Sequence, residues 1–170
     1  MMKRVALSMA WPLWLGLMTA QILLGFRLYN PSGNVPLQIM GWLVGWTAGI
    51  LGVWPIITLR QRGGLRKGKD YTNTTLLVDS GVYAVVRHPQ YLAFVFLSLF
   101  LILVVQHWLV ALLGAAAIVL MYAGIVPQAD QANLDKFGSD YQRYMQTVPG
   151  LDPVAGITRL LRRGETGEER

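Results

Sequence analysis

Residues 91–126 read YLAFVFLSLFLILVVQHWLVALLGAAAIVLMYAGIV, and this stretch decides the fold class. It contains no Asp, Glu, Lys or Arg, and only Gln106 and His107 separate its two apolar runs. A membrane-spanning helix needs about 20 mostly apolar residues. The stretch therefore predicts a tight antiparallel helical hairpin in lipid, with spans at about residues 91–105 and 108–126.

Two more apolar runs precede the hairpin, at about residues 5–26 and 37–59. A cleaved signal peptide is the alternative for the first run, but its apolar region would be only about 7–15 residues long. The second run has a small-residue face, which lets a neighbouring helix approach closely. This face consists of Gly41, Gly45, Gly49 and Gly52. We expect an all-α polytopic membrane helix bundle with four transmembrane helices, in a single integral membrane domain over residues 1–163.

The composition supports a membrane protein and excludes several other classes. The chain is 54% hydrophobic and 14% charged, whereas soluble domains carry about 25% charged residues. Its net charge of +6 would indicate nucleic acid in a soluble protein, but basic residues beside apolar spans are topology signals. There is no cysteine, which excludes thiol nucleophiles and thiolate zinc sites, and two histidines argue against a histidine-rich metal site.

The distribution of basic residues predicts the orientation. Four spans place both termini on one side, and of fifteen basic residues only Arg27 falls in a loop on the other side. The positive-inside rule then places both termini and the loop around residues 60–90 in the cytoplasm. We expect a multi-pass protein of the cell membrane.

The region after the fourth span is polar and amphipathic. Its large apolar residues recur on one helical face and predict a cytoplasmic helix over about residues 129–146 that docks on the bundle or lies in the interface. They are Leu134, Phe137, Tyr141, Tyr144 and Met145. Residues 164–170 (GETGEER) have the composition of a disordered tail.

The stretch Leu76–Ala93, LLVDSGVYAVVRHPQYLA, carries the candidate chemistry. Pro89 can begin the hairpin's first helix, because first-turn amides lack intrahelical partners. The positive end of that helix beside Arg87 and His88 suits an anionic group, such as a ligand carboxylate or a lipid phosphate. The alternative is an ordinary interface cap, with Tyr91 in the aromatic belt.

Asp130 lies just beyond the fourth span, on the same predicted side as His88. Because the hairpin is antiparallel, we expect its cytoplasmic ends to be neighbours, so that Asp130 can meet Arg87 and His88. Such a group forms either a ligand pocket or a structural ion pair.

These stretches resemble the isoprenylcysteine carboxyl methyltransferase family and related membrane methyltransferases that act on phospholipids and small thiols. The RHPxY block is shared with other membrane families, including sterol-reductase-like proteins, but its spacing from an FGxxYxxY block is more specific. The resemblance covers roughly residues 74–149. The matching residues are Leu77, Val78, Ser80, Gly81, Val82, Tyr83, Arg87, His88, Pro89, Tyr91, Leu134, Phe137, Gly138, Tyr141, Tyr144, Val148 and Pro149.

The resemblance implies S-adenosylmethionine-dependent methyl transfer to a lipophilic or membrane-embedded acceptor, with the cofactor at the cytoplasmic end of the hairpin. The reaction is an in-line displacement in which positioning carries most of the catalysis, and no residue is an obvious general base. His107 is expected on the far side, as a turn residue. The predicted cofactor-binding residues are Thr75, Leu76, Leu77, Val78, Tyr83, Arg87, His88, Pro89, Gln90, Tyr91 and Asp130.

The sequence departs from the family pattern at four positions. Ala129 and Asp130 stand where the family has paired glutamates, so Asp130 is expected to pair with the cofactor ammonium. Ile125 replaces an arginine used for substrate, which argues against a prenylcysteine carboxylate as acceptor, and Ala93 replaces a glycine.

Two alternative functions remain open: a non-catalytic family member that binds lipid or a membrane partner, and a reductase related through RHPxY.

The predicted topology can be tested with reporter tags. Tags at residue 1, between residues 62 and 69, and at residue 170 should all report cytoplasm, because nearly all basic residues flank that side. A periplasmic or extracellular signal from any of the three positions would contradict the four-span topology.

Overall fold

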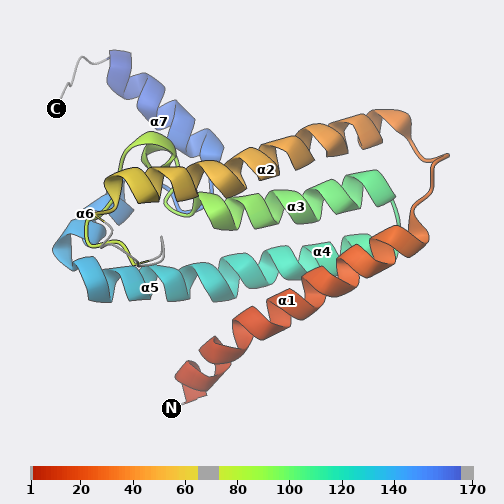
Figure 1. Ribbon diagram of the computed structural model, residues 1–170, viewed down its shortest axis with the longest axis horizontal. Coiled ribbons are helices and arrows are strands. Elements are labelled where there is room, and N and C mark those ends of the chain that lie inside the picture. The colour runs from red at the N-terminus through yellow and green to blue at the C-terminus, as the bar shows by residue number, and fades with distance from the viewer. Residues whose placement is uncertain (1, 65–72, 166–170) are drawn as a thin grey trace. The chain divides into compact units, whose positions relative to one another are not determined.

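The structure is a computed structural model that describes residues 2–64 and 73–165. The tag sites at residues 1 and 170 lie outside these ranges, as do Arg66, Lys67 and Lys69. Within the described ranges every long element is an α-helix, which confirms the all-α fold class (Figure 1). The helices are α1 (Met2–Leu28), α2 (Val35–Arg62), α3 (Pro89–Val105), α4 (Trp108–Leu120), α5 (Val126–Phe137), α6 (Ser139–Thr147) and α7 (Pro153–Glu165).

Three of the described helical stretches are long and apolar enough to cross a membrane: Met9–Leu28, Val35–Arg62 and Trp108–Phe137. The third combines α4, the π-helical turn η2 (Met121–Ile125) and α5. Helix α3 is also apolar but has 17 residues, the lower limit of the spanning range. The chain is therefore a multi-pass membrane helix bundle, whose shortest predicted span is α3.

The chain divides into two compact units, which are described separately. The first comprises Met1–Ile50 and Tyr91–Gln131, and the second comprises Leu51–Gln90 and Ala132–Arg170.

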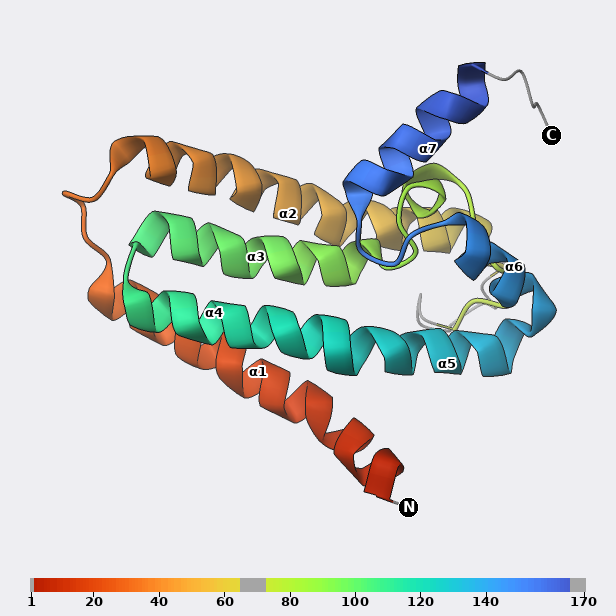
Figure 2. The same ribbon diagram turned by 180° about the vertical axis from the view of Figure 1, so that it is seen from behind.

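In the first unit α3 and α4 form the predicted hairpin (Figures 1 and 2). Gln106 turns the chain with a φ of 54°, and the His107 ring nitrogen Nδ1 accepts a 3.2 Å hydrogen bond from the Leu109 amide. The Gln106 side chain also exchanges two 2.8 Å hydrogen bonds with the Asn34 backbone. His107 is thus a turn residue, as predicted, and the α1–α2 loop is tied to the hairpin turn.

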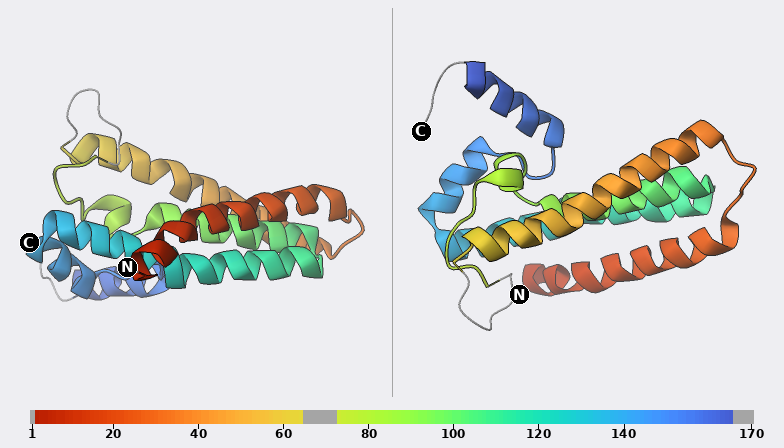
Figure 3. Two further views of the ribbon diagram at one scale, coloured as in Figure 1. Left: turned by 90° about the horizontal axis from the view of Figure 1, so that it is seen from below. Right: turned by 45° about the horizontal axis from the view of Figure 1, so that its top comes forward.

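A buried glutamine joins the helices inside this unit. Helix α1 packs along α4 (Figure 3), and Gln21 of α1 is fully buried. Its amide donates to the carbonyl oxygens of Ser98 (3.1 Å) and Val110 (3.3 Å). Interhelical hydrogen bonds of this kind stabilise membrane bundles, since lipid offers no competing partners. Gly114 leaves room for the Gln21 amide, because a Cβ atom at that position would overlap with it.

The glycine face of α2 is used only in part. A Cβ atom at Gly41 would lie 2.7 Å from Val104 Cγ2, and one at Gly45 would lie 2.8 Å from the Phe100 ring. A Cβ atom at Gly49 would meet nothing within 4 Å. The close approach to α3 therefore depends on the glycines nearest the start of α2.

The predicted helix over residues 129–146 is present but interrupted, and most of it belongs to the second unit. Helix α5 ends at Phe137 and α6 begins at Ser139. Gly138 between them has a φ of +57°, a backbone conformation that glycine adopts readily and other residues rarely adopt. The predicted apolar face is retained in a cluster of Tyr141, Tyr144 and Val148.

The chain after α6 contains a helix that the sequence analysis did not predict. Helix α7 covers residues 153–165, so the first two residues of the predicted disordered tail are helical. The rest of that tail, residues 166–170, lies outside the described residues.

Two glycine variants of α2 test the packing. Gly49→Ala should raise stability by up to about 1 kcal/mol, because alanine favours helix and the position is open. Gly41→Ala should lower it by about 1–3 kcal/mol, because the added methyl group collides with Val104. The midpoint temperatures of thermal unfolding of the two variants are measured in the same detergent. Equal midpoints would contradict the close contact of α2 with α3 at Gly41.

Candidate functional site

The two sequence blocks that carry the resemblance meet in the second unit. The Tyr144 hydroxyl of α6 donates a 2.6 Å hydrogen bond to the carbonyl oxygen of Tyr83, in the 3-10 turn η1 (Gly81–Ala84). Both tyrosines are buried. Burial raises the pKa of Tyr144 well above its ordinary value, and the nearby Tyr141 and Tyr83 raise it further. The Tyr144 hydroxyl therefore stays protonated and serves as a donor.

Backbone pairing extends this contact toward α3. The amide of Arg87 donates to the Pro149 carbonyl oxygen at 2.9 Å, and that of His88 donates to the Gly150 carbonyl oxygen at 3.1 Å. The buried His88 ring also lies beside α6, with Nε2 3.5 Å from the Tyr141 hydroxyl oxygen. The residues before α3 are therefore held by the chain that follows α6.

Helix α7 packs on the same segment. Gly156 lies directly against the Val85 carbonyl, where any Cβ atom would overlap. The Arg159 guanidinium donates to the Ala84 carbonyl oxygen. Asp152 caps the start of the helix, because its Oδ1 accepts a 2.9 Å hydrogen bond from the Ala155 amide. A glycine contact and an arginine hydrogen bond thus position α7 beside η1.

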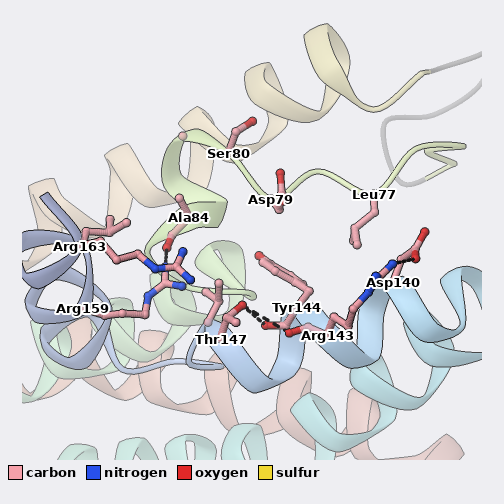
Figure 4. A pocket seen from close by; sticks show the side chains of 13 residues that line it. Leu77, Asp79, Ser80, Ala84, Asp140, Arg143, Tyr144, Thr147, Arg159 and Arg163 are labelled. Carbon is pink, nitrogen blue, oxygen red and sulfur yellow. Dashed lines mark hydrogen bonds and ion pairs between the residues drawn. The ribbon is translucent and has the colours of Figure 1, made fainter. Parts of the chain in front are cut away.

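A cavity of about 960 Å³ lies among residues 77–84, α6 and α7 (Figure 4). Its walls combine carboxylates, guanidinium groups, hydroxyls and apolar side chains, so it can bind a ligand that carries both charges and an apolar part. The lining residues are Leu77, Asp79, Ser80, Gly81, Ala84, Asp140, Arg143, Tyr144, Thr147, Val148, Arg159, Leu160 and Arg163.

Hydrogen bonds and an ion pair orient some polar groups of the cavity. Arg62 donates a 2.7 Å hydrogen bond to the Ser80 hydroxyl. Arg143 forms an exposed 2.6 Å ion pair with Asp140 within α6, and such a pair contributes little to stability. These side chains can reorient toward a ligand at low cost.

Of the predicted cofactor-binding residues, only Leu77 lines this cavity. Val78 and Tyr83 are buried in an apolar cluster with Val82. Thr75 and Leu76 are exposed, and their amides donate to the Gly63 carbonyl oxygen at 2.8 and 3.2 Å.

The remaining predicted residues lie at the start of the hairpin or in the first unit. Pro89 is buried and begins α3, as predicted, and Gln90 follows it half-buried. Tyr91 and Asp130 belong to the first unit. The Tyr91 ring packs edge-on against Trp11, with centroids 5.7 Å apart. A cofactor role for these residues stays a prediction.

The charged lining residues were missed by motif analysis. Asp79 lies inside the quoted stretch but outside the matching blocks, and Arg159 and Arg163 come from α7, which follows both blocks. The available signal was the amphipathic pattern of residues 153–163, in which arginines alternate with apolar residues at helical spacing.

Comparison with known families decides the relationship. The sequence model of the isoprenylcysteine carboxyl methyltransferase (ICMT) family matches residues 47–132, just over half of the chain. The chain belongs to this family. The ICMT match includes the RHPxY block and the hairpin and ends before Leu134, so the FGxxYxxY block lies beyond it. No curated protein and no solved structure matches the chain.

The contact between the two blocks can be tested at Tyr144. Tyr144→Phe removes the donor and leaves the buried Tyr83 carbonyl without it, which should cost about 1–3 kcal/mol of unfolding free energy. Tyr29→Phe is the matched control, because Tyr29 is 48% exposed. Only the first substitution should lower the midpoint temperature of thermal unfolding. A Tyr144→Phe protein as stable as the control would contradict the contact.

Proposed function

We propose that this ICMT-family chain transfers a methyl group from S-adenosylmethionine to a lipophilic acceptor in the cell membrane, at the cytoplasmic face. The observation that carries the proposal is the mixed-charge cavity beside the joined motif blocks. We further propose that both termini lie in the cytoplasm, as the basic residues predict.

The donor set of the cavity fits S-adenosylmethionine, which has a carboxylate, an ammonium, a sulfonium and an adenosine group. Asp79 would hold the cationic part, and Arg159 and Arg163 would hold the carboxylate. The apolar side chains Leu77 and Leu160 offer a surface for the adenine. A volume of about 960 Å³ is at the upper end of the range for small-molecule sites.

The predicted residues take different parts in this proposal. Leu77 would contact the cofactor, whereas Tyr83 and His88 would hold the surrounding backbone in place. Asp130, which the sequence analysis assigns to the ammonium, is half-buried in the first unit, and its role stays a prediction.

Bound S-adenosylmethionine supplies a methyl group activated by attachment to a positively charged sulfur. The chain's own task is to orient the reactants and exclude water, which accounts for a large share of such catalysis. Tyr144 lines the cavity, but its raised pKa and its hydrogen bond to Tyr83 keep the hydroxyl protonated. It therefore acts as a positioning group and not as a base.

One residue of the first unit, Ile125, helps to identify the acceptor. Ile125, at the position of the family's substrate arginine, is fully buried. An apolar side chain there supplies no partner for a carboxylate, so the proposed acceptor is lipophilic and lacks the prenylcysteine carboxylate. The same residue, with Ala129, supports the alternative of a non-catalytic family member that binds lipid or a membrane partner.

Calorimetric titration of S-adenosylmethionine into the detergent-solubilised full chain tests the proposal. Asp79→Asn should weaken binding about tenfold to a hundredfold, since a hydrogen bond to a charged group contributes roughly 1.5–3 kcal/mol. Asp135→Asn, an exposed carboxylate on α5 outside the cavity lining, should bind as wild type. Absence of binding by wild type would refute the proposal.

The same titration separates the two histidines. His88→Ala should weaken binding, because His88 supports the joined blocks, whereas His107→Ala alters only the hairpin turn of the first unit. Equal affinities of the two variants would count against a site in the second unit. Wild-type binding without methyl transfer to any lipid extract would favour the non-catalytic alternative.

A further inference from the structure

Helix α7 has two different faces. Its inner face carries Gly156 and Arg159, which contact the backbone of residues 84–85. Its outer face carries Val154, Ile157 and Leu161, whose exposed fractions are 72%, 51% and 66%. These three residues follow the spacing i, i+3 and i+7, so they form one apolar stripe along the helix.

Basic side chains border this stripe. A shallow groove of about 580 Å³ runs along α7 and is lined by Arg159, Arg162 and Arg163 together with Val154 and Thr158. Among the side chains that the structure describes, Asp152 at the start of the helix is the one acidic side chain in this lining. Arg159 bonds to the Ala84 carbonyl oxygen and Arg163 also lines the large cavity, so the outer surface of α7 combines the apolar stripe with the basic side chain of Arg162.

We propose that this outer surface binds an anionic phospholipid bilayer, with α7 lying in the headgroup region. Val154, Ile157 and Leu161 would insert between the lipids, and Arg162 would contact their phosphates. A helix with an apolar stripe bordered by arginines has the pattern of interfacial membrane helices. Anionic leaflets attract each nearby Lys or Arg by about 1 kcal/mol.

The charge of this surface favours a bilayer over a second copy of the chain as its binding partner. Two α7 helices that faced each other through the stripe would bring their Arg162 side chains close together, and this repulsion opposes self-association. A bilayer supplies phosphates for the same arginines and is always present for a multi-pass membrane protein.

The docking does not depend on methyl transfer, but it would affect the cavity. Arg159, Leu160 and Arg163 form the cavity wall on the same helix. Lipid contact on the outer face would therefore hold that wall at the membrane surface, where a lipophilic acceptor is found.

The absence of cysteine from the chain allows a direct test. A nitroxide label on Ile157→Cys of the full chain reports depth in nanodiscs, because oxygen enriches in lipid and a nickel chelate stays in water. In phosphatidylcholine nanodiscs with phosphatidylglycerol, the 157 label should collide more with oxygen than with the chelate. Gln146→Cys on the exposed side of α6 is the control and should show the reverse.

The charge contribution is tested in the same nanodiscs. Adding Arg162→Gln to the labelled chain should lower the ratio of inserted to free α7 by about fivefold, the effect of one basic residue near an anionic surface. Equal insertion in purely neutral nanodiscs would overturn the anionic preference. A water-exposed label in both compositions, or spin–spin broadening between two copies, would overturn the proposal.

Discussion

The Tyr144 hydroxyl and the Tyr83 carbonyl form a buried 2.6 Å hydrogen bond between segments that lie 61 residues apart. The backbone bonds of Arg87 and His88 to residues 149 and 150 lie beside it. If its partner moved away, each of these groups would stay buried without a hydrogen bond, which costs free energy. The two segments are therefore strongly held together. The cavity walls from residues 77–84 and from α6 keep their spacing because of this contact.

The same contact explains why two separated blocks occur together in the sequence. The family match ends before Leu134, yet Tyr141 and Pro149 beyond it contact the RHPxY block directly, and Tyr144 bonds to Tyr83 just ahead of that block. The aromatic residues of the second block thus mainly hold the two blocks together. The charged side chains of the cavity lining lie around these aromatic residues, at Asp79, on α6 and on α7.

The sequence predicted the membrane part of the fold well, because charge-free runs and a two-residue connection leave few alternatives for residues 91–126. It could not locate the break at Gly138, since glycine is tolerated inside helices and also ends them. The glycine periodicity of α2 identified a face but not that Gly41 meets a neighbour and Gly49 does not. Such differences depend on tertiary packing.

The lining of the candidate cavity depends on tertiary packing in the same way. Of the residues that motif matching predicted, Leu77 lines the candidate cavity, whereas Tyr83 and His88 are buried outside its lining, so their cofactor role stays a prediction. Arg159 and Arg163 belong to a helix without a family motif, so only the folded chain brings them to the cavity. Amphipathic spacing reveals such a helix, but it does not reveal which face meets η1.

Photochemical cross-linking of methyl-labelled S-adenosylmethionine to the full chain, followed by peptide mapping, tests the central claim most directly. The account predicts label on peptides that contain residues 77–84 or 140–163, with competition by unlabelled cofactor. Label confined to residues 2–50, or no competable label, would contradict a cofactor site in the second unit.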